Sequence, residues 1–491
     1  MLNGTLSTQQ LETAVASIDG RLAGGPAPLE LHIARAQFLE MLGRKDEAVR
    51  AYVDVLRIEP TQVDALNALG LLSLSAGNRD AARTLLCGAV LHGPEHAAAH
   101  ANLAGLYVLD AQLSGARTLY EEALRLDPHL AAAHHGLAEL LPRLGDDEGA
   151  ARHHALGLRY GPITIGRYTG NGRPIHILGL GTAAFGNVPT YGFFDSGVFL
   201  LASLAVEYVD PAIPLPPHDV VFNVVGEADL CAGVLATAAA IVARTDAPIV
   251  NHPSAVLATS RAANATRLRR LDGVVTPRII SFARDALTDG SAPARLREHG
   301  LRFPLLVRSP GYHTGDHFVK VDAADDLREA IAALPGDELL VIEYLGVRDA
   351  DERFRKYRVM IVDGQLYPLH LAISGEWKVH YFSADMAERA DHRAQDAAFL
   401  TDMNGVLGAR AIAALERVRD TLELDYGGID FALDRAGNVV VFEANASMIV
   451  PTPGPDARWD YRRGPVARIR RAVRAMLVRR AAAYIQGKIV R

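Results

Sequence analysis

Apolar and small residues recur with a fixed period in the first third of the chain. Prolines stand 34 residues apart, and small residues keep step with them at two further positions of each unit. Small residues let two helices approach closely, and a proline closes the second helix before the next one begins. The pattern predicts four helix pairs over residues 29–162, preceded by a single helix at about 8–22. The recurring residues are Pro26, Pro60, Pro94, Pro128 and Pro162; Ala48, Ala82, Ala116 and Ala150; and Ala36, Gly70, Ala104 and Ala138.

The remainder of the chain begins with a glycine-rich, unpatterned stretch at 161–174, which we interpret as a linker. After it, apolar runs at 175–178, 220–225 and 249–251 are predicted as buried strands, and 230–243 as an alanine-rich helix. Strands that alternate with helices imply a small parallel sheet.

Three polar residues, Asn223, Glu227 and Asp229, lie at or just past the end of the second of these strands. Open α/β sheets bind ligands at the carboxyl ends of their strands, so these side chains are candidates for substrate contact. A helix-capping role for Glu227 and Asp229 fits their position equally well.

A further apolar run ends in Arg308, and a return strand that carries Lys320 follows it. Between the two strands lies a loop at 309–316 that contains Gly311 and Gly315. Glycines let such a loop lay its backbone N–H groups against phosphates, with the two cations flanking it. An ordinary hairpin with basic ends explains this stretch equally well when it is taken alone.

The last pattern is a predicted hairpin near the C-terminal end, with turn residues at its centre. A four-residue loop after Asp434 would place Asp430 opposite Glu443, and Asn445 would point from the same face. Directly opposed carboxylates lie roughly 5 Å apart and repel, so a cation is predicted between them. Two acids and an amide supply oxygen ligands, which suit Mg²⁺ better than zinc. The alternative, a solvated face with two scattered acids, conflicts with the apolar run at 439–442.

Composition and charge narrow the classes of function. The chain of 491 residues has room for about two to four domains, and its 49% apolar and 22% charged residues are ordinary for a soluble globular protein. A net charge of −6 gives no reason to expect nucleic-acid binding. The N-terminus lacks a signal-peptide pattern, and the apolar runs are too short to span a bilayer. Cys87 and Cys231 fall in different predicted domains, so we expect no disulfide and a cytoplasmic location.

The periodic first third resembles an array of tetratricopeptide repeats. Such an array is a solenoid with a concave surface that is suited to peptides or protein segments. The sequence leaves open whether this groove holds a substrate or packs on the rest of the chain. His32, His100 and His134 share the fourth position of their repeats, where the family usually has a large packing aromatic. Packing is favoured over a metal site, because ligands one repeat apart are too distant to share an ion.

Residues 175–450 resemble the ATP-grasp superfamily of ligases. The features that carry the resemblance are a Phe-Pro-led strand with a glycine loop, an acid-aromatic hinge, an Arg-Val strand and the terminal Asp…Glu-x-Asn. The spacing of the terminal motif is that of D-alanine–D-alanine ligases. The stretch from Arg358 to Lys378 is closer to ribosomal-protein glutamate ligases and glutathione synthetases.

The two resemblances imply a multidomain chain. It would begin with an all-α tetratricopeptide solenoid at 1–163, followed by an α/β pre-grasp domain at 174–265 and an α+β ATP-grasp domain at 266–456. A basic helix at 460–491 would end it. The tail has no acidic residue after Asp460 and keeps apolar residues at helical spacing. Packing on its own domain is the favoured interpretation, with an anionic membrane or RNA as the alternative partner.

The resemblance implies an ATP-dependent carboxylate–amine ligase that forms an amide through an acyl phosphate. Its substrate would be a peptide or an amino-acid-like molecule presented by the repeats. The implied cofactors are ATP and a pair of Mg²⁺ ions, for which Mn²⁺ can substitute. The residues that match are Arg308, Gly311, Gly315 and Lys320 for the phosphates; Glu343, Tyr344 and Leu345 for adenine; Asp430, Glu443 and Asn445 for the metal; and Arg358 and Lys378 for the developing oxyanion.

The chain departs from the family pattern at two positions. Arg308 stands where the family usually has lysine, and Gly428 stands where D-alanine–D-alanine ligases carry arginine. Arg358 is our candidate for the missing charge, with a structural ion pair as its alternative role. The alternative function is a catalytically weak or inactive ATP-grasp protein that acts as a tetratricopeptide scaffold. No nucleic-acid partner and no membrane span are expected, and a homodimer is left open.

Overall fold

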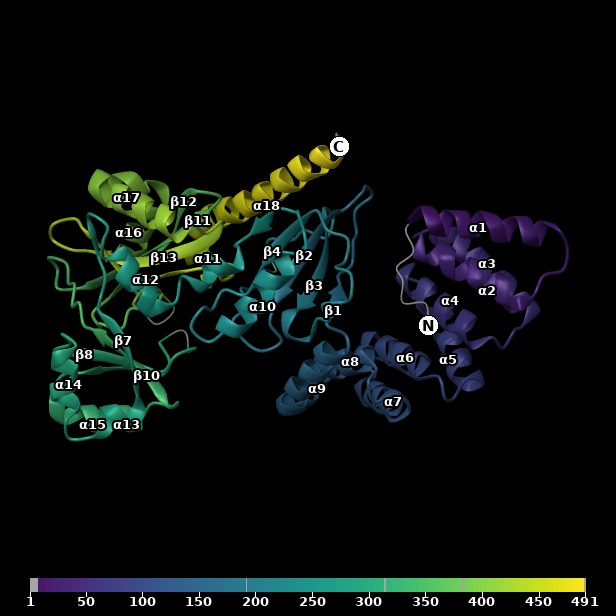
Figure 1. The fold of residues 1–491 in the computed structure, drawn as a ribbon, viewed down its shortest axis with the longest axis horizontal. Helices are drawn as coiled ribbons and strands as arrows, with labels where there is room; N and C mark the ends of the chain where they lie inside the picture. The colour runs from purple at the N-terminus through teal and green to yellow at the C-terminus, as the bar shows by residue number, and fades with distance from the viewer. Residues whose placement is uncertain (1–7, 191, 313–314, 382–383, 490–491) are drawn as a thin grey trace. The chain divides into compact units, whose positions relative to one another are not determined.

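The computed structural model describes residues 8–190, 192–312, 315–381 and 384–489. The chain divides into two compact units, Met1–Pro162 and Ile163–Arg491 (Figure 1). The finer division of the second unit into pre-grasp and ATP-grasp domains stays a prediction. Both cysteines are free thiols in the structure, Cys87 exposed in the first unit and Cys231 buried in the second. In the part of the chain that the structure describes, no helix is long and apolar enough to cross a membrane.

The first unit is an array of helix pairs. The four predicted pairs and the helix before them are confirmed, and a proline stands between one pair and the next. Figure 1 shows the two helices of each pair side by side. The helices are α1 (Thr8–Ala23); α2 (Leu29–Met41) with α3 (Lys45–Ile58); α4 (Val63–Ser75) with α5 (Arg79–His92); α6 (Ala97–Leu109) with α7 (Leu113–Leu126); and α8 (Ala131–Leu140), the 3₁₀ turn η1 (Leu141–Leu144) and α9 (Asp147–Tyr160).

The recurring small residues lie where helices touch. Ala36, Ala48 and Ala82 are fully buried, and a Cβ at Gly70 would lie only 2.7 Å from the Cγ of Leu86. Close packing leaves no room for larger side chains at these positions, which explains their period.

The histidines at the fourth repeat position have a structural role in two repeats. His100 and His134 are buried, and their Nε2 atoms lie 3.0 Å from the carbonyl oxygens of Pro94 and Pro128. A carbonyl only accepts, so each imidazole donates to the proline that closes the preceding helix pair. The packing interpretation is therefore confirmed for these two histidines, with a hydrogen bond added.

The second unit contains three sheets, of which the first has the strand order β1-β3-β2-β4-β5. β2, β4 and β5 are parallel, as predicted, and β3, a stretch whose sequence fits a helix or a strand, joins them as a further parallel strand. β1 adds an antiparallel edge strand. The helix α10 (Ala232–Val242) packs Leu178, Val221 and Ala238 into a common core with this sheet. The strands are β1 (Ile163–Ile165), β2 (Ile175–Gly181), β3 (Phe199–Ala205), β4 (Val220–Asn223) and β5 (Ile249–Val250), with the 3₁₀ turn η2 (Val206–Tyr208) after β3.

The second sheet has the order β7-β10-β8-β9 and is antiparallel throughout. Helices α13, α14 and α15 share its core and lie along it in Figure 1. The elements are β7 (Ile279–Ala283), α13 (Arg284–Thr288), α14 (Ala292–Glu298), β8 (Leu305–Arg308), β9 (Phe318–Val321), η3 (Ala324–Asp326), α15 (Leu327–Ala332) and β10 (Glu338–Glu343).

The third sheet has the order β12-β11-β13-β14-β6, and α16 and α17 pack on one of its faces. Its other face shares a core with the first sheet and with the C-terminal helix α18. The elements are β6 (Val274–Val275), β11 (Phe354–Val362), β12 (Gln365–Ser374), α16 (Ala390–Thr401), α17 (Met403–Leu422), β13 (Tyr426–Leu433), β14 (Val439–Asn445), η4 (Ala457–Trp459) and α18 (Asp460–Ile489).

The basic C-terminal helix packs on its own unit, which confirms the favoured interpretation. Val466, Ile469 and Val473 are buried in the shared core. Its arginines also bind this unit: Arg480 pairs with Asp425, and Arg470 donates to the Val450 carbonyl oxygen at 3.1 Å.

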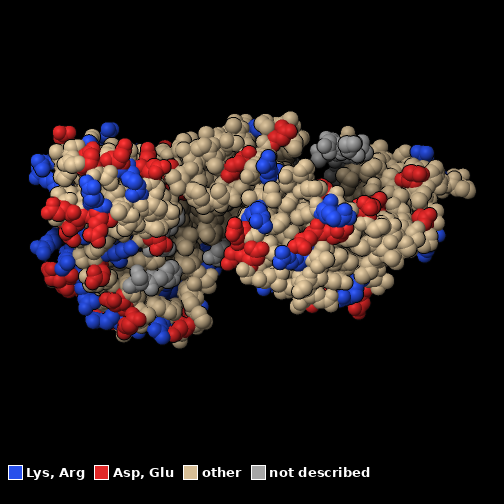
Figure 2. Space-filling view, turned by 90° about the horizontal axis from the view of Figure 1, so that it is seen from below, with Lys and Arg blue, Asp and Glu red and all other residues tan. Residues whose placement is uncertain are grey.

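On the face drawn in Figure 2, acidic and basic side chains lie interspersed, as on a solvated mixed-charge surface.

Candidate functional site

The hairpin of β13 and β14 opposes two acids by a different route from the one predicted. Leu433 pairs with Val439, so five residues, 434–438, form the loop, and the predicted loop that sets Asp434 against Val439 is wrong. The longer loop alone would shift Asp430 one residue out of step with Glu443. A β-bulge at Phe442 adds one residue to β14 and restores the pairing. The predicted opposition of the two acids is confirmed.

The acid pair belongs to a row of four side chains that crosses the third sheet. His370 pairs with Arg358, Arg358 with Asp430, and Asp430 with Glu443, on β12, β11, β13 and β14. Residues directly opposite one another on neighbouring strands share a face of the sheet. An imidazole, a guanidinium and two carboxylates are therefore neighbours in space, although up to 85 residues separate them in sequence.

Asp430 is buried and bound by two cations. Arg358 donates from Nε and Nη2 to the two carboxylate oxygens, at 2.5 and 2.7 Å, and Lys356 Nζ lies 3.2 Å from Oδ2. Burial opposes ionisation of Asp430, but the two cations outweigh it and hold its pKa well below the usual range. Asp430 is therefore an ionised carboxylate at neutral pH.

Glu443 is bound by a cation from outside the sheet. Arg261 is the first residue of α12 (Arg261–Leu268), and its Nη2 donates to Glu443 Oε1 at 2.7 Å. Burial raises the pKa of Glu443, but the charges of Arg261 and Arg308 outweigh this effect and bring the pKa below its usual value. Asn445 donates its side-chain N–H to Glu443 Oε1 at 2.9 Å, and its oxygen accepts from Ser447.

The protein thus supplies the cations that opposed acids require. A metal between Asp430, Glu443 and Asn445 stays a prediction, because the ion pairs of the two acids are formed by side chains of the protein. Two ionised carboxylates on one face fit Mg²⁺ chemically, whereas the amide oxygen of Asn445 is engaged by Ser447. Among the described residues, no group of three or more His, Cys, Asp or Glu side chains could hold a metal. The two carboxylates alone would leave most ligand positions of a Mg²⁺ ion to oxygens from outside the protein.

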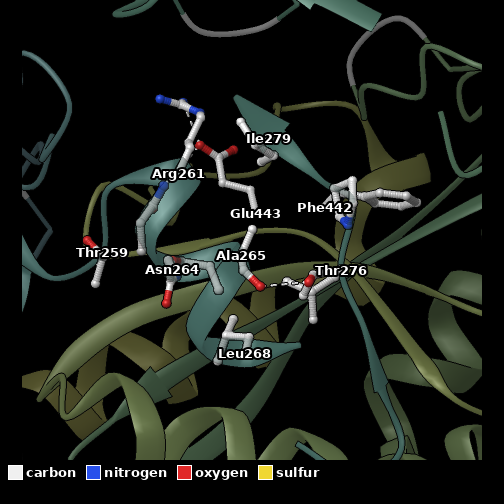
Figure 3. A pocket seen from close by; sticks show the side chains of 13 residues that line it. Thr259, Arg261, Asn264, Ala265, Leu268, Thr276, Ile279, Phe442 and Glu443 are labelled. Carbon is white, nitrogen blue, oxygen red and sulfur yellow. Dashed lines mark hydrogen bonds and ion pairs between the residues drawn. The ribbon is translucent and has the colours of Figure 1, made fainter. Parts of the chain in front are cut away.

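Figure 3 shows the surroundings of Glu443 and Arg261. Asn264, Phe442 and Thr276 line the same narrow pocket, whose cavity volume of about 20 Å³ has room for a water molecule. The exposed ring of Phe442, a consequence of the bulge, is 39% accessible. No strand pattern could have located it, because the bulge is not visible in sequence.

The predicted phosphate cations lie among aromatic rings of the second sheet. Arg308 at the end of β8 donates to the carbonyl oxygen of Tyr312, and its guanidinium stands 5.4 Å from the Phe318 ring. Lys320 on β9 pairs with Asp322 and stands 5.0 Å from the ring of the hinge residue Tyr344. Burial and the charge of Arg261 lower the pKa of Arg308 to about 10.

Trp377 joins this group to the predicted catalytic Lys378. Its ring lies 5.3 Å from that of Phe318 and 6.3 Å from that of Tyr344. Lys378 Nζ donates to the Phe318 carbonyl oxygen at 3.4 Å. The structure therefore brings Arg308, Lys320, Tyr344 and Lys378 together around two aromatic rings that the sequence had not singled out.

The two loop glycines are required by space and by backbone conformation. Gly311 has φ +81°, and a Cβ there would overlap Leu230 Cδ1. Gly315 has φ +84°, and a Cβ there would overlap Lys378 Cε. The remaining loop residues His313 and Thr314 lie outside the described residues.

The hinge residues are fixed by backbone contacts. Glu343 N donates to the carbonyl oxygen of Arg278 at 2.8 Å, and Arg278 N donates back to the Glu343 carboxylate at 3.0 Å. The carbonyl oxygen of Leu345 accepts from Val347 N at 2.8 Å. The carboxylate of Glu343 thus holds the hinge to β7.

The polar residues after β4 divide into two roles. Asn223 is buried and donates to the carbonyl oxygen of Asn251 at 3.1 Å, so it serves the fold. Asp229 accepts from Arg261 Nη1 at 2.7 Å and from Arg261 N, in the first turn of α12, at 3.0 Å. Glu227 Oε1 accepts from Asp229 N at 2.9 Å and lies 3.7 Å from Arg261 Nη1. Neither acid is the N-cap of a helix, because α10 begins after Cys231 and α12 after Ser260. The structure therefore places both acids at Arg261, which is the site residue that sequence reasoning missed.

Comparisons with solved structures reach only part of the chain. MamA from Desulfovibrio magneticus RS-1 is 24% identical over 31% of this chain and 85% of its own, with a TM-score of 0.28. TTC0263, a thermophilic TPR protein in Thermus thermophilus, is 19% identical over 31% and 84%, also at 0.28. YrrB, a TPR protein with an unusual peptide-binding site, is 18% identical over 31% and 79%, at 0.27. No protein-family model and no curated protein matches the chain.

Proposed function

We propose that the second unit is an ATP- and Mg²⁺-dependent ligase of the ATP-grasp type that joins a carboxylate to an amine. The observation that supports this most is the row of Arg358, Asp430 and Glu443, with two ionised carboxylates opposed between arginines. Apolar residues would stabilise a buried sheet as well as such ion pairs do. A set of fixed charges is better explained by binding and neutralising a polyphosphate.

The reaction proceeds in two steps. The γ-phosphoryl group of ATP passes to an oxygen of the substrate carboxylate, and ADP leaves. The amine nitrogen then attacks the acyl carbon, the C–O bond to phosphate breaks, and the nitrogen loses a proton as the amide forms. Both steps build negative charge on oxygen, and one positioned donor is worth roughly 3–4 kcal/mol in comparable sites.

The side chains around the two aromatic rings are assigned to the nucleotide. Arg308 and Lys320 bind phosphate oxygens, helped by the backbone N–H groups of the loop that holds Gly311 and Gly315. The hinge formed by Glu343, Tyr344 and Leu345 receives the adenine.

The charged row is assigned to the reacting end. Mg²⁺ on Asp430 and Glu443 would neutralise the transferring phosphoryl group. Arg358 uses Nε and Nη2 on Asp430, which leaves Nη1 for the developing oxyanion. Lys378 assists from the loop side.

The charges of the site suggest what it accepts. Around the acid pair, Asp430, Glu443, Glu227 and Asp229 balance Arg358, Lys356, Arg261 and Arg308. Lys320 is paired with Asp322, and Lys378 adds one positive charge. A site whose charges nearly balance favours a ligand of small net charge. The net charge of ATP with bound divalent cations is smaller than that of free ATP. Nucleotide affinity should therefore depend on the divalent cation.

Thermal unfolding with nucleotide tests this function. MgADP should raise the melting temperature, since a ligand that binds only the folded state stabilises it. ADP without a divalent cation should have a much smaller effect. ADP release from ATP, with pools of carboxylates and amines, should be lost in Glu443→Gln. The matched control is Glu416→Gln, an exposed glutamate on α17.

A chain that shows no shift with MgADP would leave the scaffold alternative, in which the repeats bind partners and the second unit is inactive. We further propose that the repeats present a peptide or amino-acid-like substrate, and that the protein is cytoplasmic. Activity measured with and without residues 1–162 tests the role of the repeats.

A further inference from the structure

Arg261 joins carboxylates from two separate segments of the second unit. Its Nη1 donates to Asp229 at 2.7 Å and lies 3.7 Å from Glu227, whereas its Nη2 donates to Glu443 at 2.7 Å. Asp229 and Glu227 follow β4 of the first sheet, and Glu443 belongs to β14 of the third. One side chain therefore connects the strand ends of the first sheet to the acid pair.

The connection is rigid for geometric reasons. A guanidinium is planar and its N–H groups form a fixed fork, so the two carboxylates that it holds cannot move independently. The backbone also takes part, because Asp229 Oδ1 accepts from Arg261 N at 3.0 Å. Asp229 thus fixes both the main chain and the head group of Arg261.

The connection is also shielded from water. The side chains of Arg261 and Glu227 are only 8% and 3% exposed, and those of Asp229 and Glu443 are 16% and 25% exposed. Burial opposes the charge of Arg261, yet the three carboxylates raise its pKa above the usual value. In such partly buried surroundings the three ion pairs share one guanidinium, so the loss of one carboxylate changes how Arg261 binds the others.

We propose that Arg261 is a positioning residue that makes the placement of Glu443 depend on the loop with Glu227 and Asp229. That loop lies at the carboxyl end of a parallel strand, where open α/β sheets bind ligands. A substrate group that engages Asp229 or Glu227 thereby changes the affinity of the acid pair for a metal-bound nucleotide. The inference rests on the proposed function, because it needs a nucleotide at Glu443.

A double-mutant cycle on MgADP affinity tests the inference without turnover. Calorimetry compares the wild type, Asp229→Asn, Arg261→Gln and the double variant. Asp229→Asn should weaken MgADP binding on the order of tenfold, although Asp229 is not assigned to the nucleotide. The same change in the Arg261→Gln background should have little further effect. Asp289→Asn, at an exposed pair with Arg295, is the matched control and should bind as the wild type does.

The outcomes separate the two proposals. Absence of MgADP binding by the folded wild type overturns the proposed function. Binding by the wild type together with an unchanged Asp229→Asn overturns the inference alone, and so does an additive double variant. If Arg261→Gln does not fold, the cycle is run with Arg261→Lys, whose single ammonium group cannot bridge both carboxylates. Non-additivity in either cycle supports the inference.

Discussion

Two buried carboxylates in the second unit, Asp430 and Asp396, are held in opposite ways. Asp430 is bound by Arg358 and Lys356, and the pKa of this acid lies well below its usual range. Asp396 on α16 is fully buried and accepts from two tyrosine hydroxyls and a backbone N–H. Arg462 forms a longer ion pair with Asp396, with its Nε 4.0 Å from the carboxylate. Burial raises the pKa of Asp396 above the usual value, and the tyrosine hydroxyls, the Leu371 N–H and Arg462 offset only part of that.

The difference shows what burial does alone and what cations add. Burial disfavours the charged form of both acids, and the charged or polar groups that contact each acid decide how far this is offset. At Asp430 two cations reverse the effect of burial on the pKa, whereas at Asp396 the hydroxyls and the more distant Arg462 do not. An acid held ionised by two cations is what the proposed function requires of Asp430.

The largest expected effect comes from Asp430→Asn. It leaves Arg358 buried without its carboxylate, and we expect a loss of about 3–5 kcal/mol in the free energy of unfolding, together with loss of ADP release. Urea unfolding and a coupled ADP assay measure the two. The paired change Arg358→Met with Asp430→Leu should recover most of the stability and none of the activity. Recovery of activity in that variant would show that the charges serve folding alone.

A smaller effect is expected for Asp396→Asn. The amide still accepts from the backbone N–H of Leu371, so the free energy of unfolding should fall by about 1–3 kcal/mol. MgADP affinity should equal that of the wild type. If Asp396→Asn weakened MgADP binding as much as Asp430→Asn does, the two acids would not differ in role.

The pH dependence of stability should change in opposite directions in the two variants. The lowered pKa of Asp430 makes the native state more stable as pH rises towards the unfolded value of about 3.9, and this contribution is complete above that value. The raised pKa of Asp396 makes stability fall over the range above that value. Asp430→Asn should therefore flatten the rise of stability with pH below about pH 4, and Asp396→Asn should remove a fall of stability that begins above about pH 4. Shifts in the same direction would contradict the assignment.

The smallest effect is expected for Lys356→Met. Lys356 makes one contact with Asp430 at 3.2 Å, whereas Arg358 makes two that are shorter. The free energy of unfolding should fall by about 1 kcal/mol, and ADP release should persist at a reduced rate. A loss equal to that of Asp430→Asn would show that both cations are indispensable to the ionised state.

The helical array was predictable because its contacts are local and repeat. The same residue types mark the helix contacts in each unit of 34 residues. Pro60 and Ala82, for example, occupy the same positions of their units as Pro94 and Ala116. The array itself is established by this period and by the helix pairs of the chain.

The site was predictable only where one hairpin holds it together. Asp430 and Glu443 lie in one hairpin, and their opposition followed from strand geometry even though the loop length was wrong. Arg261 is 182 residues from Glu443, and no local pattern links the two. His370 lies beside Arg358 because β12 pairs with β11 in this register, and no spacing in the sequence reveals that register.

The bulge at Phe442 has a consequence for what the hairpin can touch. In an ordinary strand, successive side chains point to opposite faces of the sheet. A ligand on one face therefore meets only every second residue. Val439, Val441 and Ala444 of β14 pack in the core with α17, and the bulge leaves the consecutive residues Phe442 and Glu443 both lining the pocket beside Arg261. A flat apolar ring and a carboxylate thus stand next to each other on one strand.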